Sequence, residues 1–365
     1  MSPCIKDHFL EMTDFRQIKK CKHLLSDILL IGLCTYLSNG EDYEDMALFA
    51  ESHGAALPEL FDLPNGVPSH DTFRRVFQML DCKELKHMLT AQGKAILDTL
   101  AEKQICLDGK KLRGANPRSR GNKGLWIVNA WVGENRLCVC QEKVEDKRNE
   151  ISAIPLIIAQ LDITDAVVTI DAIGCQTAIA EQIVDQGGHY LLAVKGNQND
   201  LLEEVVCAFK ACASQASVES WEYGRNRFET RHCSILSAHT SVDSHFLEKW
   251  SGLSTLVKVV ATRLIGTQKT EETRYYISDE VSSNAQYFSL LSQGHWGIEN
   301  HLHWHLDVTF REDACRVRTG NGPENLATLR KCALQIITHH KDRLSLKKRR
   351  VKAAYDVKYL KELLT

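Results

Sequence analysis

The chain of 365 residues is 44% apolar and 25% charged, and its formal net charge is −2. These values are ordinary for a globular protein of roughly two or three structural units, and they exclude nucleic-acid binding through overall charge alone. The thirteen cysteines form no Cys-x-x-Cys pair, a pattern typical of reduced, intracellular thiols. The longest apolar stretch, 24–37, contains Asp27 and is too short for a membrane span. We therefore expect a cytoplasmic protein with no membrane partner.

Residues 1–103 are predicted to form an all-helical unit. The apolar run 24–37 predicts a buried helix, and residues 72–80 predict a later one with a single apolar face. Arg74 and Arg75 point away from that face. A short helix with exposed arginines, preceded by a loop and an earlier helix, suits a helix-turn-helix-like DNA contact. It is equally consistent with a plain solvated face, so the unit is a candidate DNA-binding domain.

From residue 104 the pattern changes to short apolar runs that alternate with helical segments. Strands are expected at 104–108, 125–132, 136–144, 166–171 and 189–195, and helices at 150–161, 177–186 and 200–213. Three adjacent strands followed by strand–helix alternation predict a mixed sheet with flanking helices, in the order of a ribonuclease-H-like α/β core. We place this catalytic unit at 104–340, with a β-rich insertion at about 218–277. A basic helical tail is expected at 341–365.

Three acidic residues carry the predicted chemistry. Asp108 and Asp171 each end a predicted apolar strand, and strand-terminal acids on neighbouring strands meet at one edge of a sheet. Glu299 lies on a predicted helix that opens with a capping-box pattern at 283–286. Converging carboxylates repel one another unless hard cations lie between them, and Mg²⁺ and Mn²⁺ prefer oxygen ligands. The pattern predicts a site for two such ions that supports phosphodiester chemistry.

Basic residues gather beside this predicted metal site. The segment 109–123 contains six of them and no acid: Lys110, Lys111, Arg113, Arg118, Arg120 and Lys123. We interpret the segment as a loop that contacts DNA, with a flexible solvated hairpin as the alternative. Lys195, at the end of a predicted core strand, is positioned either to reach a phosphate near Asp171 or to neutralise that carboxylate.

The motifs around the three acids carry a family resemblance. They are LDGKKLRG at Asp108, TIDAIGCQ at Asp171, VKGNQ at 194–198 and HWGIENHLHWHLDVTFRED at Glu299. Together with KHLLSDILLI, VPSHDTFRRVF and KRNEISAIP, these motifs resemble the H-repeat-associated branch of the bacterial insertion-sequence DDE transposases over nearly the whole chain. The family's DDE residues fall on Asp108, Asp171 and Glu299.

This resemblance implies an RNase H-like catalytic core with a β-rich insertion before the last acidic helix. It also implies Mg²⁺-dependent DNA cleavage and strand transfer at element ends. The partners would be double-stranded DNA and a second copy of the chain in a synaptic complex, acting on chromosomal or plasmid DNA. Related groups place a Tyr, an Arg and a Lys around the Glu, where this chain has Ser292, His295 and Leu306. Of these, His295 is expected to contact a phosphate.

Three other functions remain open from the residues. A stand-alone metal-dependent nuclease would use the same site, and a DNA-binding protein that no longer transposes would keep only the basic surface. A zinc protein would use ligands from this set: His295, Glu299, His301, His303 and His305. Zinc is disfavoured because alternating histidines on a helix point to different sides.

Overall fold

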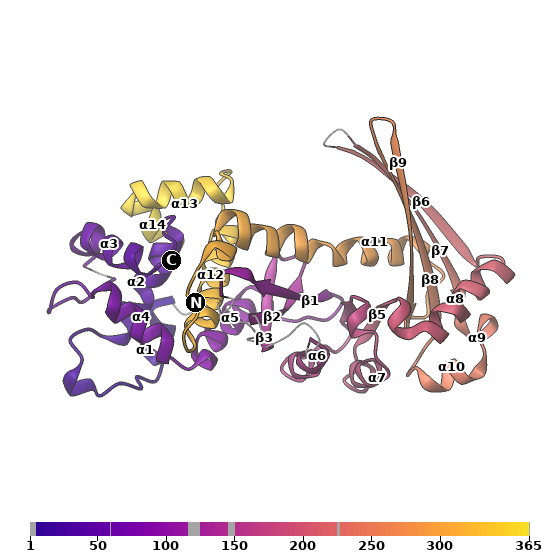
Figure 1. Cartoon of the computed structure of the whole chain (residues 1–365), viewed down its shortest axis with the longest axis horizontal. Helices are drawn as coiled ribbons and strands as arrows, with labels where there is room; N and C mark the ends of the chain where they lie inside the picture. Colours follow the sequence, from indigo (N-terminus) through magenta and orange to yellow (C-terminus); the bar gives the residue numbers. More distant parts are fainter. Residues whose placement is uncertain (1–4, 59, 116–124, 145–149, 225–226, 365) are drawn as a thin grey trace.

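The structure, a computed structural model, describes residues 5–58, 60–115, 125–144, 150–224 and 227–364. It has three parts in a row: a helical unit, a central sheet with helices on both faces, and an outer extension of that sheet (Figure 1). No helix in these residues is both long and apolar enough to cross a membrane. The cysteines within these ranges are free thiols.

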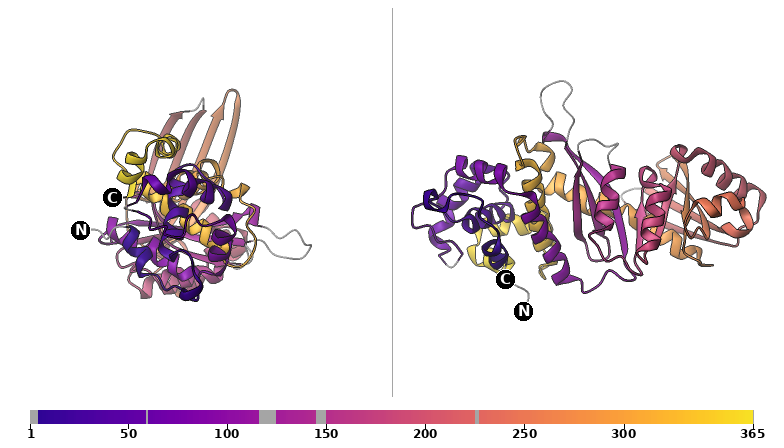
Figure 2. Two further views of the ribbon diagram at one scale, coloured as in Figure 1. Left: turned by 90° about the vertical axis from the view of Figure 1, so that its left-hand side faces the viewer. Right: turned by 90° about the horizontal axis from the view of Figure 1, so that it is seen from below.

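The helical unit combines both ends of the chain. Its members are α1 (Ile5–Glu11), α2 (Leu25–Leu37), α3 (Tyr43–His53), α4 (His70–Met79), α5 (Cys82–Ile96), α12 (Gly322–His339), α13 (Leu346–Tyr355) and α14 (Val357–Leu364). Every residue of α2 is buried, Asp27 included, as its largely apolar sequence predicts. Apolar residues from the first helices and from α12 to α14 share one core (Figure 2). The core therefore crosses the boundaries that we expected at 103 and 340.

The basic tail contributes buried cations to this unit. The Arg350 side chain is buried, and its guanidinium donates to the carbonyls of Tyr36 at 2.7 Å, of Gly40 at 3.1 Å and of Thr309. It also lies 4.3 Å from the ring of Phe310. Arg350 thus binds carbonyl groups at the ends of two helical segments. The charge pattern alone could not distinguish this role from a solvent-exposed basic surface.

The central sheet follows the predicted order. Its strands are β1 (Gln104–Leu112), β2 (Leu125–Val132), β3 (Leu137–Val144), β4 (Val167–Ile170) and β5 (His189–Val194). They lie in the order β3-β2-β1-β4-β5, with β3, β2 and β1 antiparallel and β1, β4 and β5 parallel. This is the ribonuclease-H-like arrangement. One boundary was wrong: β1 does not end at Asp108 but continues to Leu112, because its second half pairs with β2.

The β-rich insertion extends this sheet. Its strands are β6 (Ala216–Gly224), β7 (Arg227–Ser237), β8 (Thr255–Ile265) and β9 (Gln268–Ser278), with the short helices α9 (Ala238–Ser241) and α10 (Ser244–Lys249) between β7 and β8. The last of these strands, β9, pairs antiparallel with β5 and completes a nine-stranded sheet. The outer halves of the four strands project beyond the rest of the molecule (Figure 1). The insertion therefore brings β9 to the edge of the core.

Helices cover both faces of the sheet. On one face lie α6 (Glu150–Ile158), α7 (Thr177–Asp185) and α8 (Asn199–Ala211), and α11 (Ala285–His295) runs along the other (Figure 1). The N-cap of α11 is Asn284, whose side chain accepts hydrogen bonds from the backbone N–H groups of Gln286 and Tyr287. The expected cap, Ser283, was therefore one residue too early. Asn and Ser are both good caps, so the sequence alone did not separate them.

Candidate active site

Asp108 and Asp171 are neighbours because β1 and β4 are parallel. The last pair in register is Leu107 with Ile170; Asp108 is the next residue of β1, and Asp171 is the first residue after β4. Side chains alternate between the faces of a strand, so both aspartates project to the face that α11 covers. Beyond this point β4 ends, and the Asp171 side chain accepts from the backbone N–H of Ile173 at 3.1 Å. The aspartates therefore stand where the two strands separate.

Glu299 comes from a π-helical segment rather than from the predicted α-helix. After α11 the chain forms π-helical turns over Ile298–His303 and His305–Thr309. Each such turn is closed by a backbone hydrogen bond between residues five positions apart, as from the Trp304 N–H to the Glu299 carbonyl. Ile298 is buried against the helical unit, whereas Glu299 is exposed and lines a cavity. Short π-helical stretches are frequent at functional sites, but apolar spacing does not reveal them.

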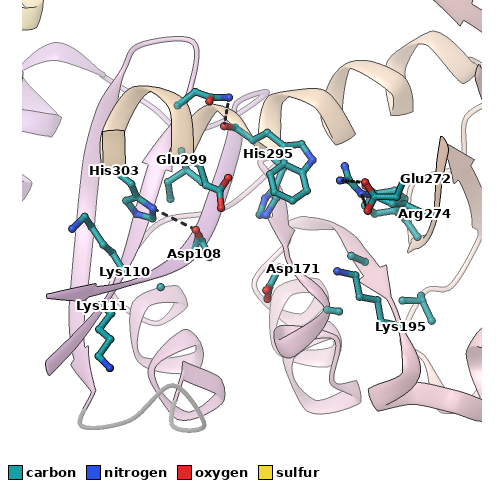
Figure 3. A pocket seen from close by; sticks show the side chains of 18 of the residues that line it. Asp108, Lys110, Lys111, Asp171, Lys195, Glu272, Arg274, His295, Glu299 and His303 are labelled. Atoms are coloured by element: carbon teal, nitrogen blue, oxygen red, sulfur yellow. Dashed lines mark hydrogen bonds and ion pairs between the residues drawn. The ribbon is translucent and has the colours of Figure 1, made fainter. Parts of the chain in front are cut away.

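The three acids line one cavity of about 920 Å³. Its walls come from β1, the segment after β4, the π-helical segment and β9 (Figure 3). The structure therefore brings together Asp108, Asp171 and Glu299, which are widely separated in the sequence. Their assignment as the catalytic residues remains a proposal.

Asp108 is destabilised in its ionised form. Burial is the largest cause, and the charges of Asp171, Glu150 and Glu299 add to it; together they raise its pKa to about 8. Sequence analysis missed the contribution of Glu150, which is buried at the start of α6. A Cβ on Gly109 would lie 2.4 Å from a Glu150 carboxylate oxygen. Because Gly109 has no side chain, the Glu150 carboxylate fits against the backbone beside the site. This glycine directly after Asp108 was the sequence feature that could have indicated a fourth acid.

His303 faces Asp108. Its Nδ1 lies 3.5 Å from the Asp108 carboxylate (Figure 3). Its Nε2 lies 3.4 Å from the Asn129 side-chain nitrogen. Burial, with the charges of Lys110 and Lys331, lowers the pKa of His303 to about 3. The imidazole is therefore neutral at neutral pH and positions Asp108 through a polar contact rather than through an ion pair.

His295 also lines the cavity, but it contributes no positive charge at neutral pH. Its Nδ1 lies 3.1 Å from the Thr169 hydroxyl. Burial is the largest cause that lowers its pKa to about 4. The expected phosphate contact would therefore have to use a neutral imidazole N–H.

The proposed zinc cluster does not assemble in the described residues. His295 contacts Thr169 and His303 contacts Asp108, whereas His305 Nδ1 lies 3.0 Å from the Thr309 hydroxyl. The histidines thus face different surroundings. Across the described ranges, no three His, Cys, Asp or Glu side chains are placed to enclose a metal ion.

Lys110 was wrongly expected in a DNA-binding loop. It lies on β1 and is buried, with its ammonium 2.7 Å from Asp307, 2.9 Å from Glu312 and 3.6 Å from Asp313. Lys110 shares the cavity side of β1 with Asp108, two residues earlier. Because the strand continues past Asp108, this lysine meets the acidic segment that follows the π-helical turns.

The other predicted basic residues divide into two groups. Lys111, Arg113 and Lys195 line the cavity. The Lys111 ammonium lies 5.7 Å from the centre of the Trp126 ring. Arg113 and Lys195 are exposed, and the Nε of Arg113 lies 3.4 Å from the Asp313 carboxylate. Arg118, Arg120 and Lys123 lie outside the described residues. No ion pair joins Lys195 to Asp171 within the part of the chain that the structure describes.

The types of donor in the cavity match a divalent cation, although Asp108, Asp171 and Glu299 do not enclose a metal position in the described residues. Three carboxylates supply the oxygen ligands that Mg²⁺ and Mn²⁺ prefer. Burial is the main cause of the raised pKa of Asp108, and repulsion by Asp171, Glu150 and Glu299 adds to it; a bound cation would relieve that repulsion. Mg²⁺ commonly takes only one or two carboxylates and completes its shell with phosphate oxygens and water. Asp108, Asp171 and Glu299 are the residues that would hold it here.

Comparison with known proteins agrees with this geometry. Residues 99–336 match the family model described as Transposase DDE domain, and residues 6–91 match the one described as DDE_Tnp_1-associated. The chain belongs to the DDE transposase family. The family resemblance expected from the motifs is therefore confirmed, and this transposase carries the associated N-terminal region in its helical unit.

The transposase has relatives over its whole length. The H repeat-associated putative transposase YhhI of Escherichia coli is 34% identical over 99% of this chain and 97% of its own. The putative transposase YncI of another Escherichia coli strain is 34% identical over 98% of this chain and 93% of its own. An uncharacterised protein in the dhlA 3′ region of Xanthobacter autotrophicus is 38% identical over 77% of this transposase and 96% of its own chain.

Proposed function

We propose that this transposase cleaves DNA at the ends of an insertion-sequence element and joins those ends to target DNA. Asp108, Asp171 and Glu299 would be its catalytic residues and would hold two Mg²⁺ or Mn²⁺ ions. The observation that carries the proposal is the shared cavity, which three distant parts of the chain build around these acids. Double-stranded DNA at the element ends and at the target would be its substrate, and two copies of the chain would form the synaptic complex.

Two phosphodiester reactions would take place in this cavity. In the first, water attacks a phosphorus atom at the element end, and the bond to the 3′ oxygen breaks to leave a free 3′-hydroxyl. In the second, that hydroxyl attacks a target phosphodiester and displaces the 3′ oxygen of the target strand. The bound cations would activate the attacking oxygen and stabilise the leaving one. The neutral His303 would orient Asp108, and Lys110 would fix β1 against the acidic segment.

Asp108→Asn and Asp171→Asn test the proposal. The DNA probe is a duplex taken from the sequence that flanks the gene, incubated with purified protein and Mg²⁺. Each variant should lose cleavage but retain DNA binding, because it loses a cation ligand and keeps the basic surface. The matched control is Asp98→Asn, at an exposed position outside the cavity. Cleavage near the wild-type rate by either active-site variant would show that the assignment is wrong.

A metal-dependent nuclease with the same site would also lose cleavage in these variants. Joining to a second DNA molecule separates the two functions. A transposase yields products in which the element end is covalently linked to a target plasmid, whereas a nuclease yields cut ends alone. A protein that only binds DNA would give neither product in the wild type.

A further inference from the structure

The wall of the cavity opposite Lys111 is built by the β-rich insertion. Arg274 and its neighbours on β9 line the cavity together with Lys195, which follows β5. Figure 3 shows Lys110 and Lys111 at one end of the site, Lys195 and Arg274 at the other, and the acids between them. Lys110 is occupied by three carboxylates. Arg274 and Lys195 therefore supply the positive charge at the insertion end.

Arg274 is held in a defined orientation. Its Nε and Nη2 donate to the two carboxylate oxygens of Glu272 at 2.8 and 2.7 Å, a bidentate geometry that fixes the plane of the guanidinium. Its central carbon lies 4.4 Å from the ring centre of Trp296, within the range of a cation–π contact. Trp296 itself lies three positions before Glu299, so the stack joins the insertion to the start of the π-helical segment.

This arrangement leaves Arg274 with donors for an anion. The guanidinium carries five N–H donors; two bind Glu272 along one edge of the fork, and a hydrogen bond to Tyr276 uses another. The side chain of Arg274 is 26% exposed and that of Glu272 is 57% exposed. An ion pair as exposed as this one contributes little to stability and is weakened by salt. Stabilisation of the fold by the Arg274–Glu272 pair therefore does not explain well why the pair lies in the cavity.

We propose that Arg274, stacked on Trp296 and oriented by Glu272, is a binding subsite for a backbone phosphate of the DNA strand that runs from the three acids toward the insertion. The subsite rests on the proposed function, because the strand must pass through the same cavity. In this arrangement the insertion takes part in DNA binding through β9. Arginine suits the role because its planar fork binds phosphate and stacks on an aromatic ring at the same time.

The chain offers a close control for Arg274. Arg263 lies on the adjacent strand β8, and its Nε donates to a Glu229 oxygen at 2.8 Å. It is more exposed than Arg274, at 52%, but it does not line the cavity. Arg263→Gln therefore removes a paired arginine from the same sheet extension without touching the proposed subsite.

The test measures DNA binding in the presence of EDTA, so that no cleavage occurs. The probe is a fluorescent 40-bp duplex from the DNA that flanks the gene, and anisotropy gives Kd over a range of NaCl concentrations. Each phosphate contact contributes about −0.9 to the slope of the logarithm of the association constant against the logarithm of salt concentration. Arg274→Gln should make the slope shallower by about one, whereas Arg263→Gln should leave it unchanged. Arg274→Lys keeps the charge but loses the planar fork and the stack on Trp296, so its Kd should rise while its slope stays close to that of the wild type.

Thermal melts show whether each variant folds, and Arg274→Lys gives a second measurement should Arg274→Gln unfold. An unchanged slope in Arg274→Gln, an equal change in Arg263→Gln, or a wild-type Kd in Arg274→Lys would each overturn the subsite. Failure of the proposed function is separate, since it appears as a wild-type protein that does not cleave DNA. A wild type that cleaves, with an unchanged slope in Arg274→Gln, would reject the subsite alone.

Discussion

The ammonium of Lys110 lies 2.9 Å from the carboxylate of Glu312, and both side chains are buried. Burial alone would raise the pKa of Glu312, but the charges of Lys110, Lys331 and Arg330 lower it overall. The pair therefore joins β1, two residues after Asp108, to the segment that follows the π-helical turns. A buried pair of this kind holds geometry, and removal of one partner leaves the other charge uncompensated.

Lys110→Met should destabilise the protein by about 3–5 kcal/mol, because Glu312 and its acidic neighbours lose their buried counter-charge. Urea unfolding monitored by circular dichroism measures the change. Lys111→Met is the control, since the Lys111 ammonium lies over the Trp126 ring at 5.7 Å, and it should cost at most about 1 kcal/mol. Equal effects in the two variants would contradict the buried cross-link.

The raised pKa of Asp108 predicts a stability that depends on pH in the metal-free protein. The unfolded carboxyl ionises near 3.8 and the folded one at about 8. Between these values the folded state binds the extra proton, so the contribution of Asp108 to stability is greatest at low pH and is lost as pH rises through about 8. Asp108→Asn removes this titration. In EDTA, its Tm should therefore rise relative to the wild type from pH 5 to pH 8.

Asp98→Asn serves as the control for this pH series, because Asp98 is exposed and lies outside the cavity. Its Tm should follow that of the wild type across the range. If the difference between Asp108→Asn and wild type stays constant with pH, Asp108 does not carry the raised pKa.

Glu299→Gln separates a hard-cation site from the zinc alternative. In EDTA, the variant should be slightly more stable than the wild type, because one charge leaves a set of mutually repelling acids. Mn²⁺ should raise the Tm of the wild type but not of the variant, since a ligand that binds only the folded state stabilises it in proportion to its affinity. Thermal melts with EDTA, Mg²⁺, Mn²⁺ and Zn²⁺ measure both effects.

Glu181→Gln, at an exposed position on α7, controls for loss of an acid elsewhere and should respond to Mn²⁺ as the wild type does. Under the zinc alternative, His303→Ala and His305→Ala would remove bound Zn²⁺, and chelation would unfold the protein. Stoichiometric Zn²⁺ in the purified protein, with the same Mn²⁺ shift in Glu299→Gln and wild type, would exclude the proposed cation site.

Arg74→Ala combined with Arg75→Ala should weaken binding to the flanking duplex and leave the fold intact. Both arginines are exposed on α4, and Arg74 pairs only with the half-exposed Asp71 at 2.8 Å, a contact that adds little stability. Loss of phosphate contacts should make the salt dependence of Kd shallower. Lys347→Ala with Lys348→Ala, an exposed pair on α13, is the matched comparison. A salt dependence identical to the wild type would remove α4 from the DNA interface.

Apolar periodicity by itself was sufficient to predict the helical first unit, the strand order of the core and the β-rich insertion. These features are local or follow from short connections, so the spacing of buried side chains along the chain specifies them. The proximity of Asp108 and Asp171 was also predictable, because each follows a short apolar run, although β1 continues past Asp108. The motifs around the three acids identified the family.

Only the tertiary structure decided the role of each charged residue. Lys110 was expected in a DNA-binding loop and Arg350 in a basic tail, but Lys110 is buried among acids and Arg350 binds helix-end carbonyls. Arg274, which the sequence did not single out, stacks on Trp296 beside the cavity. The partners Glu312, Tyr36 and Trp296 come from other elements. The free energy of a charged group in the folded protein depends on how far packing desolvates it and on which partners packing places beside it. The order of residues along the chain specifies neither.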